Sequence, residues 1–163
     1  MNVQLEIKVD QNMGIQSLNK INNIARIWLS TLLKALIRNG KYNLYYNLIN
    51  KIIYNLLLKF KNLNKFFKKI EQNLCVPIRI IKKKIAGRYL LIPFYIKEKK
   101  YIKYSIRIII KSLKLRTEKH LYLKVYNELL DIYNNKGISI KNKIDLCKEF
   151  KKNISNIRLL KFK

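Results

Sequence analysis

Few side chains in this sequence could perform acid–base, nucleophilic or metal chemistry. One histidine and nine carboxylates stand among 36 lysines and arginines. His120 has no cysteine or acidic partner at a spacing typical of a catalytic pair or a metal site, and we interpret Glu118 as a residue that stabilises a helix N-terminus. The four glycines are isolated, so the sequence has no glycine-rich phosphate loop. These observations predict a protein that is not an enzyme and needs no cofactor.

The two cysteines also lack the spacing of a reactive or metal-binding pair. Cys75 and Cys147 lie 72 positions apart, and neither belongs to a CxxC motif. A disulfide framework and a zinc site are therefore not indicated, and we expect two reduced thiols.

Phosphate binding is the chemistry that the sequence does favour. In "VPIRIIKKKIAGRYLLIPFYI" (76–96), two apolar arms, each with one proline, flank a short basic tip. β-Branched and aromatic residues in the arms and the glycine between them predict two strands, and Pro77 and Pro93 predict a ribbon outside any central sheet. The basic residues of this tip are Lys82, Lys83, Lys84 and Arg88.

A second basic cluster follows directly after the ribbon. In "KEKKYIKYSIRIIIKSLKLR" (97–116), isoleucine and leucine recur at helical spacing and predict a buried face. Basic residues recur at steps of three or four on another face of the same helix. This basic stripe consists of Lys100, Lys103, Arg107, Lys111 and Lys114.

The overall charge supports a polyanionic partner. The formal net charge is +27, of which residues 1–81 carry +10 and residues 82–163 carry +17. This net positive charge is larger than a small domain needs for solubility, and a polyanionic partner would neutralise it. Eight phosphate contacts would give a slope of about −7 for the logarithm of the binding constant against the logarithm of the salt concentration.

Apolar periodicity predicts the elements that position these clusters. The expected helices cover residues 17–39, 42–60 and 64–74, a segment within 97–116, and residues 117–135 and 141–153. In the second helix we expect a broad buried stripe that includes Leu44 and Leu57, in the fifth an N-terminal cap at Thr117, and in the last a buried Ile144. The expected fold is mainly α: a bundle of about six helices with a protruding two-stranded β-ribbon arm.

The domain organisation expected is simple. Residues 1–163 form a single domain, with the arm at about 75–96 and an N-terminal extension at about 1–16. The longest runs without a charged residue contain nine residues, about half of what a membrane-spanning helix needs. We therefore expect no membrane partner.

Composition also bears on origin. Isoleucine, lysine and asparagine, which have A/T-rich codons, dominate the sequence and suggest an organellar genome. The beginning "MNVQLEIKVDQNMGIQ" has two acidic residues and no arginine, unlike an import presequence. These features predict a protein made inside the organelle, a mitochondrion or alternatively a plastid.

Three segments resemble the small-subunit ribosomal protein seven family. "LLKALIRNGK" (32–41) is similar to that family's first core helix and its Gly-Lys turn, and residues 76–93 are similar to its proline-bounded arm. The third segment, "YNELLDIYNNKGISIKNKIDL" (126–146), is the most specific. Its matching residues are Asn127, Glu128, Leu129, Asn135, Lys136, Gly137, Lys141 and Asp145.

The resemblance implies a structural role in a small ribosomal subunit, and the composition makes an organellar subunit, first the mitochondrial one, the expected location. It implies binding to the 3′ major (head) domain of small-subunit rRNA, support of head assembly, and an arm near the exit site for mRNA and tRNA, beside neighbouring ribosomal proteins. This sequence departs from the family pattern at the tip of the arm, where Ala86 stands in place of a second glycine. The candidate RNA-binding residues are Lys82, Lys83, Lys84, Arg88, Lys100, Lys103, Arg107, Lys111, Lys114, Lys136, Lys141 and Lys143.

Two other classes of protein remain open from the residues alone. A basic architectural DNA-binding protein could lay the ribbon along a minor groove, with Ile85 as the apolar wedge at the tip. A peripheral membrane protein could use basic amphipathic helices on anionic lipids, although the inward apolar stripes are expected to be occupied within the fold.

Overall fold

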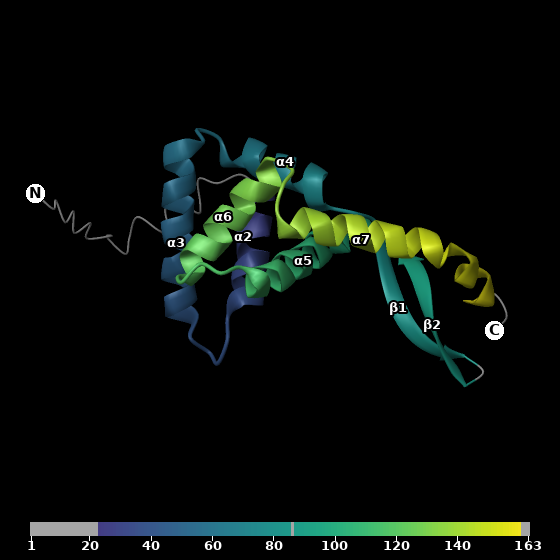
Figure 1. The fold of residues 1–163 in the computed structure, drawn as a ribbon. Coiled ribbons are helices and arrows are strands. Elements are labelled where there is room, and N and C mark those ends of the chain that lie inside the picture. The colour runs from purple at the N-terminus through teal and green to yellow at the C-terminus, as the bar shows by residue number, and fades with distance from the viewer. Residues whose placement is uncertain (1–22, 86, 161–163) are drawn as a thin grey trace, which may run out of the picture.

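The computed structural model describes residues 23–85 and 87–160. Its helices gather into one body, with α3 at one end and a two-stranded ribbon projecting at the other (Figure 1). The helices are α2 (Asn23–Leu36), α3 (Tyr42–Lys59), α4 (Leu63–Leu74), α5 (Tyr101–Leu115), α6 (Leu121–Tyr133) and α7 (Ile138–Lys152). The strands are β1 (Ile78–Ile85) and β2 (Arg88–Tyr95), and two short 3-10 segments are η1 (Glu98–Lys100) and η2 (Ile154–Leu160). The predicted helical bundle with a β-ribbon arm is confirmed.

Local sequence signals explain where the first helices stop and start. Asn39 and Gly40, with φ of 51° and 70°, reverse the chain after α2, as the predicted Gly-Lys turn requires. Before α4, the side-chain oxygen of Asn62 accepts hydrogen bonds from the backbone N–H groups of Asn64 and Lys65 at 3.0 and 3.3 Å. This cap satisfies two donors that a helix N-terminus leaves without intrahelical partners.

The core of the bundle is built around aromatic rings. Trp28 of α2 stacks on Phe67 of α4 with ring centroids 6.2 Å apart, and Phe66 stacks on Tyr133 of α6 at 5.1 Å. Trp28, Phe66 and Phe67 are buried almost completely. Since full burial of one such side chain contributes about 1.5 to 3 kcal/mol, these contacts fix α2, α4 and α6 to one another.

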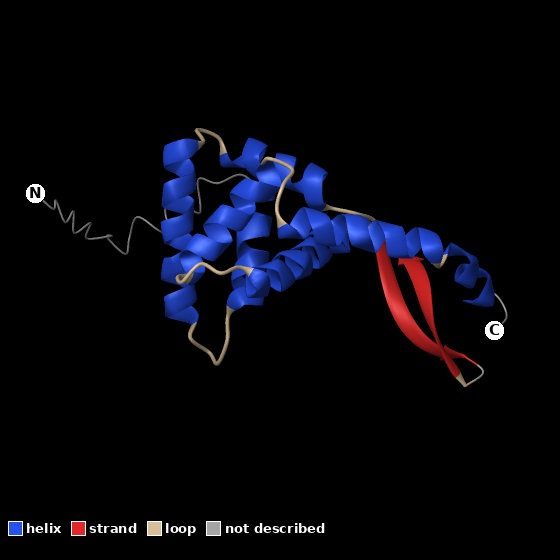
Figure 2. Ribbon diagram, in the orientation of Figure 1, coloured by secondary structure: helices blue, strands red, loops and turns tan. Residues whose placement is uncertain are grey.

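The arm is an antiparallel pair that belongs to no larger sheet in the described part of the chain (Figure 2). Its register runs from Ile78 opposite Tyr95 to Ile85 opposite Arg88. Gly87 takes a φ of 79° at the turn, a conformation open to glycine without a Cβ penalty. The tight register therefore places the predicted basic tip at the end of the ribbon.

The root of the arm packs against the C-terminal helices. Ile92 is fully buried, and the ring of Tyr95 meets that of Phe150 of α7 edge-on at 5.6 Å. The side-chain amide of Asn156 in η2 donates a hydrogen bond to the carbonyl of Leu91 at 2.9 Å. A small second hydrophobic cluster thus holds the base of the ribbon outside the main core.

Several helix boundaries and faces differ from the sequence expectations. The expected start of the first helix at residue 17 lies outside the described residues, as does the proposed N-terminal extension. In α3 the buried face is narrower than expected, because Leu44 and Leu57 are 57% and 42% exposed. Only Ile49, Ile52, Ile53 and Leu56 of α3 are buried.

The expected cap of α6 is wrong. The helix begins at Leu121 with His120 in the capping position, three residues after Thr117. Glu118 lies before the helix, outside the first turn in which it was expected, and accepts hydrogen bonds from Arg116 at 2.8 and 3.1 Å. The side-chain pairing has displaced the helix start.

The last helix starts earlier than expected, at Ile138, and turns a different face inward. Ile144 is 47% exposed, which contradicts the prediction that it is buried, whereas Phe150 is buried as predicted. Ser139 and Ile140, near the helix start, are buried instead. The inward face of α7 therefore runs through Ser139, Lys143 and Phe150, and Ile144 lies beside it.

Candidate nucleic-acid interface

The tip of the arm carries four exposed cations. Register places Lys82 opposite Leu91, Lys83 opposite Leu90 and Lys84 opposite Tyr89. Because side chains alternate along a strand, Lys82 and Lys84 share one face of the ribbon and Lys83 takes the other. The ammonium groups of Lys82 and Lys84 lie 4.9 and 6.0 Å from the centroid of the Tyr89 ring. Both faces of the tip therefore present positive charge to the outside.

A tyrosine flanked by two arginines connects the arm to α5. Arg79 of β1 donates a hydrogen bond to the hydroxyl of Tyr104 at 2.6 Å. The guanidinium carbons of Arg79 and of Arg107 each lie 5.1 Å from the centroid of the Tyr104 ring. Tyr104 thus holds Arg79 of the arm and Arg107 of α5 close together, and the basic surfaces of the arm and of α5 are continuous at this point. Sequence reasoning missed Arg79, because its partner is 25 residues away.

The predicted basic stripe of α5 is exposed along its length. Lys103, Arg107, Lys111 and Lys114 all face solvent, and Lys100 does so in η1 just before the helix. At 100° per residue, the four helical positions fall within an arc of about 80° and span about 17 Å. Buried Ile106, Ile109 and Leu113 lie on the opposite side. Neither α5 nor the arm contains an acidic residue.

The remaining three candidates are in different surroundings. Lys136, in the turn after α6, and Lys141, in the first turn of α7, are exposed. Lys143 is half-buried, and its ammonium donates a hydrogen bond to the backbone carbonyl of Asn73 in α4. The charge of Lys143 therefore serves the packing of α7 on α4.

Among the described residues, the most extensive ion-pair network is centred on Arg116. Arg116 contacts the carboxylates of Glu118, Glu128 and Asp131 at 2.7, 2.5 and 2.7 Å. Glu128 is fully buried and also accepts the backbone N–H of Ser139 at 3.0 Å. Hydrogen bonding to Arg116 lowers the pKa of Glu118 to about 2, and hydrogen bonding to Glu118 raises the pKa of Arg116 above its usual value. The network ties α6 to the start of α7.

His120 and the two cysteines are the side chains that the sequence offered for acid–base, nucleophilic or metal chemistry. His120 is exposed, with its ring 6.0 Å from that of Tyr122. The sulfur of Cys75 lies 3.0 Å from the hydroxyl oxygen of Ser105, and burial raises the pKa of this thiol to about 11. Both cysteines are free thiols. No cluster of three or more possible metal ligands occurs within residues 23–85 and 87–160.

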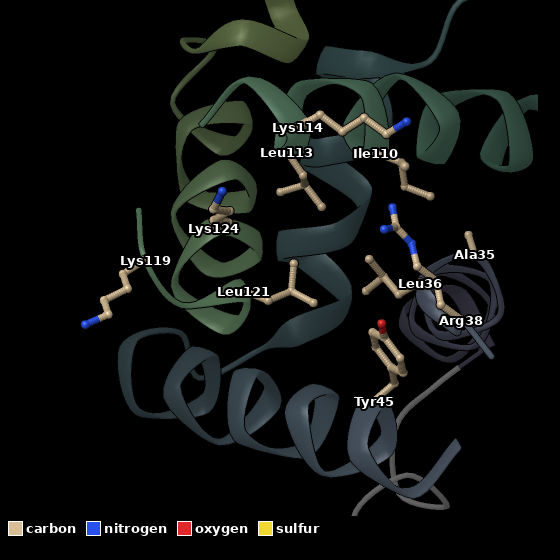
Figure 3. Close-up of a pocket in the computed structure, with 10 residues that line it drawn as sticks. All are labelled: Ala35, Leu36, Arg38, Tyr45, Ile110, Leu113, Lys114, Lys119, Leu121 and Lys124. Atoms are coloured by element: carbon tan, nitrogen blue, oxygen red, sulfur yellow. The ribbon is translucent and has the colours of Figure 1, made fainter. Parts of the chain in front are cut away.

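A pocket of about 270 Å³ opens beside the last turn of α5 (Figure 3). It is formed where α2, α3, α5 and α6 approach one another, and sequence reasoning did not anticipate it. Its lining residues are Ala35, Leu36, Arg38, Tyr45, Ile110, Leu113, Lys114, Lys119, Leu121 and Lys124. Four of these ten side chains are basic and none is acidic.

These features define a class: a basic helical-bundle protein with a β-ribbon arm. None of the helices within the described ranges is long and apolar enough to span a bilayer. The family model described as "Ribosomal protein S7p/S5e" matches residues 8–153, and the chain therefore belongs to this ribosomal protein family. The family resemblance inferred from the three sequence segments is confirmed.

Individual relatives span bacteria and organelles. The small ribosomal subunit protein uS7 of Carsonella ruddii (strain PV) is 34% identical over 122 residues, which cover 74% of this chain and 78% of the relative. The protein uS7c of Cyanidium caldarium is 31% identical over 121 residues, with the same coverage of 74% and 78%. The protein uS7 of Pelagibacter ubique is 27% identical over 127 residues, covering 75% and 81%. The relatives thus carry both the uS7 and the uS7c designation.

Proposed function

We propose that the chain is a structural protein of a small ribosomal subunit and binds the 3′ major domain of small-subunit rRNA. The arm tip and the α5 stripe are the contact surface. The observation that carries the proposal is the run of cations from Lys84 through Arg79 and Arg107 to Lys114, along two elements without a carboxylate. Because the family and the relatives are ribosomal, we infer that the polyanion bound by these cations is rRNA.

Affinity in this proposal comes from phosphate contacts and selectivity from shape. Phosphate neutralisation is insensitive to base sequence, so the lysines alone would bind any nucleic acid. Folded RNA is recognised largely by the positions of its phosphates and 2′-hydroxyls. A rigid bundle with an arm at a fixed angle matches one such arrangement, and the arm then reaches toward the exit site for mRNA and tRNA.

We further propose an organellar ribosome, first the mitochondrial one, as the location. The support is the excess of residues with A/T-rich codons. Neighbouring small-subunit proteins would be contacted by surfaces other than the arm and the α5 stripe. Sedimentation of organelle lysates tests this location, since the protein should travel with the small subunit of one organelle only.

A competition experiment tests the binding proposal. The full chain is titrated into labelled 3′ major-domain transcript at 150 mM KCl, with unlabelled transcript or duplex DNA as competitor. We expect the transcript to compete far better than DNA at equal nucleotide concentration. Equal competition would show a general polyanion binder and would refute rRNA as the specific partner.

A further inference from the structure

The pocket beside α5 combines an apolar floor with a basic rim. Leu36, Ile110, Leu113 and Leu121 form the floor, and Leu36 and Leu113 belong to the buried core. In Figure 3, Tyr45 points from α3 toward these leucines with its hydroxyl foremost. Such a floor attracts a flat, weakly polar group and offers one hydroxyl to orient it.

None of the residues that line the pocket carries a negative charge. In Figure 3, Arg38 extends from the end of α2 toward Ile110. The ammonium of Lys124 donates a hydrogen bond to the backbone carbonyl of Arg116 at 2.7 Å. Among the described residues, ion pairs are formed by Arg116 and Lys148 and not by Arg38, Lys114 or Lys119. An anion entering the pocket would therefore meet cations that no carboxylate has neutralised.

We propose that this pocket holds one unstacked nucleotide of an RNA strand. The base lies on Leu36, Ile110 and Leu121 with an edge toward the Tyr45 hydroxyl, and its phosphate contacts Arg38 and Lys114. The volume of about 270 Å³ is near the lower end of small-ligand pockets and suits one nucleotide. Bases leave the stack most readily in loops, bulges and single strands.

The position of the pocket agrees with this occupant. Lys114 is both the last residue of the α5 stripe and part of the pocket rim. A strand that follows the stripe away from the arm would reach the pocket at the end of the helix. The inference rests on the proposed rRNA binding, and it adds a site that reads a base as well as phosphates.

Methyl NMR of the full chain tests the pocket with 5′-AMP as the probe. We expect 5′-AMP to shift the methyl resonances of Ile110 and Leu121 with a Kd on the order of 1 mM, since a single nucleotide lacks the other contacts of a strand. Inorganic phosphate at equal ionic strength should not reproduce the shifts. Unmoved methyl resonances, or equal shifts with phosphate alone, would overturn the proposal.

Two matched variants separate this pocket from the rest of the surface. Ala35 lines the pocket from an exposed position, so Ala35→Phe fills it without removing a buried contact. Asn47→Phe, on the exposed side of α3, adds the same ring elsewhere. Ala35→Phe should abolish the 5′-AMP shifts and weaken transcript binding about tenfold, as expected for one lost base contact, while Asn47→Phe should change neither.

The failures of the two proposals are distinguishable. If Ala35→Phe blocks 5′-AMP but leaves transcript affinity unchanged, the RNA strand does not use the pocket and the inference is wrong. If instead the transcript shows no preference over duplex DNA, the proposed function is wrong, and the 5′-AMP shifts then decide only whether a nucleotide site exists.

Discussion

Neutralising the arm tip should reduce the salt dependence of RNA binding without unfolding the protein. The variant changes Lys82, Lys83, Lys84 and Arg88 to glutamine together. All four side chains are exposed, and the ion pairs of the described residues do not include them. The contacts that are lost within the protein are those of Lys82 and Lys84 with Tyr89, each worth about 0.5 to 1 kcal/mol at an exposed site.

The size of the effect follows from counterion release. With eight phosphate contacts the slope is about −7, and removing four of them leaves about −3.5. Between 50 and 200 mM salt, the wild-type affinity should fall about 10⁴-fold and the variant affinity about 10²-fold. The difference in slope is therefore large compared with the error of a titration.

The assay measures transcript affinity at four or five salt concentrations for the wild type, the arm variant and a charge-matched control. The control changes Lys59, Lys61, Lys65 and Lys68 to glutamine, because these exposed residues lie around the end of α3 and the start of α4, away from the arm (Figure 1). An arm variant that keeps the wild-type slope, or a control that loses as much slope as the arm variant, would refute a localised contact surface.

Further predictions concern stability and reactivity. Arg116→Gln leaves buried Glu128 without its partner and should lower the free energy of unfolding by about 3 to 5 kcal/mol in urea titrations; a loss below about 1 kcal/mol would contradict a buried pair. The lowered pKa of Glu118 gives stability that is complete above about pH 4.5 and is lost as pH falls through about 2, so acid titration of Glu118→Gln should lack this component. Gly137→Ala, at φ 92° and with its Cβ 2.9 Å from that of Asp131, should cost at least about 1 to 3 kcal/mol in the same assay, and an unchanged midpoint would be inconsistent with this geometry. Because burial raises its pKa to about 11, Cys75 should react with a disulfide reagent much more slowly in the native than in the unfolded protein, and equal labelling rates in the two states would contradict this.

The fold was predictable because each helix and the ribbon are specified by sequence signals that lie within the element itself. Apolar residues at helical spacing and a proline-bounded, glycine-tipped ribbon each specify structure within a few residues. The errors arose where a distant partner decided the outcome. Arg116 gathers Glu118 together with Glu128, 10 residues further along, and so moves the start of α6. Ile144 is exposed because the inward face of α7 runs through Ile140, Lys143 and Phe150, and position 144 lies beside that face.

The candidate interface divides in the same way. The α5 stripe follows from spacing alone, since residues three and four apart share a helix face. Whether a particular lysine faces solvent depends on tertiary contacts, and Lys143 turns inward to Asn73 for that reason. The pocket combines Arg38 with Lys114 and Lys124, which lie on three separate parts of the chain. No periodicity within one segment could have brought these residues together.

The clamped root of the arm has a mechanical consequence. The hydrogen bond from Asn156 holds the ribbon at Leu91, which is opposite Lys82. Only the three residue pairs beyond this point, about 10 Å of strand, extend past the last hydrogen bond to the C-terminal segment. So short a ribbon end bends little, so the three lysines and Arg88 keep fixed positions before they meet their target. Shortening the C-terminal 3-10 segment would lengthen the unsupported part of the ribbon and increase the motion of its tip.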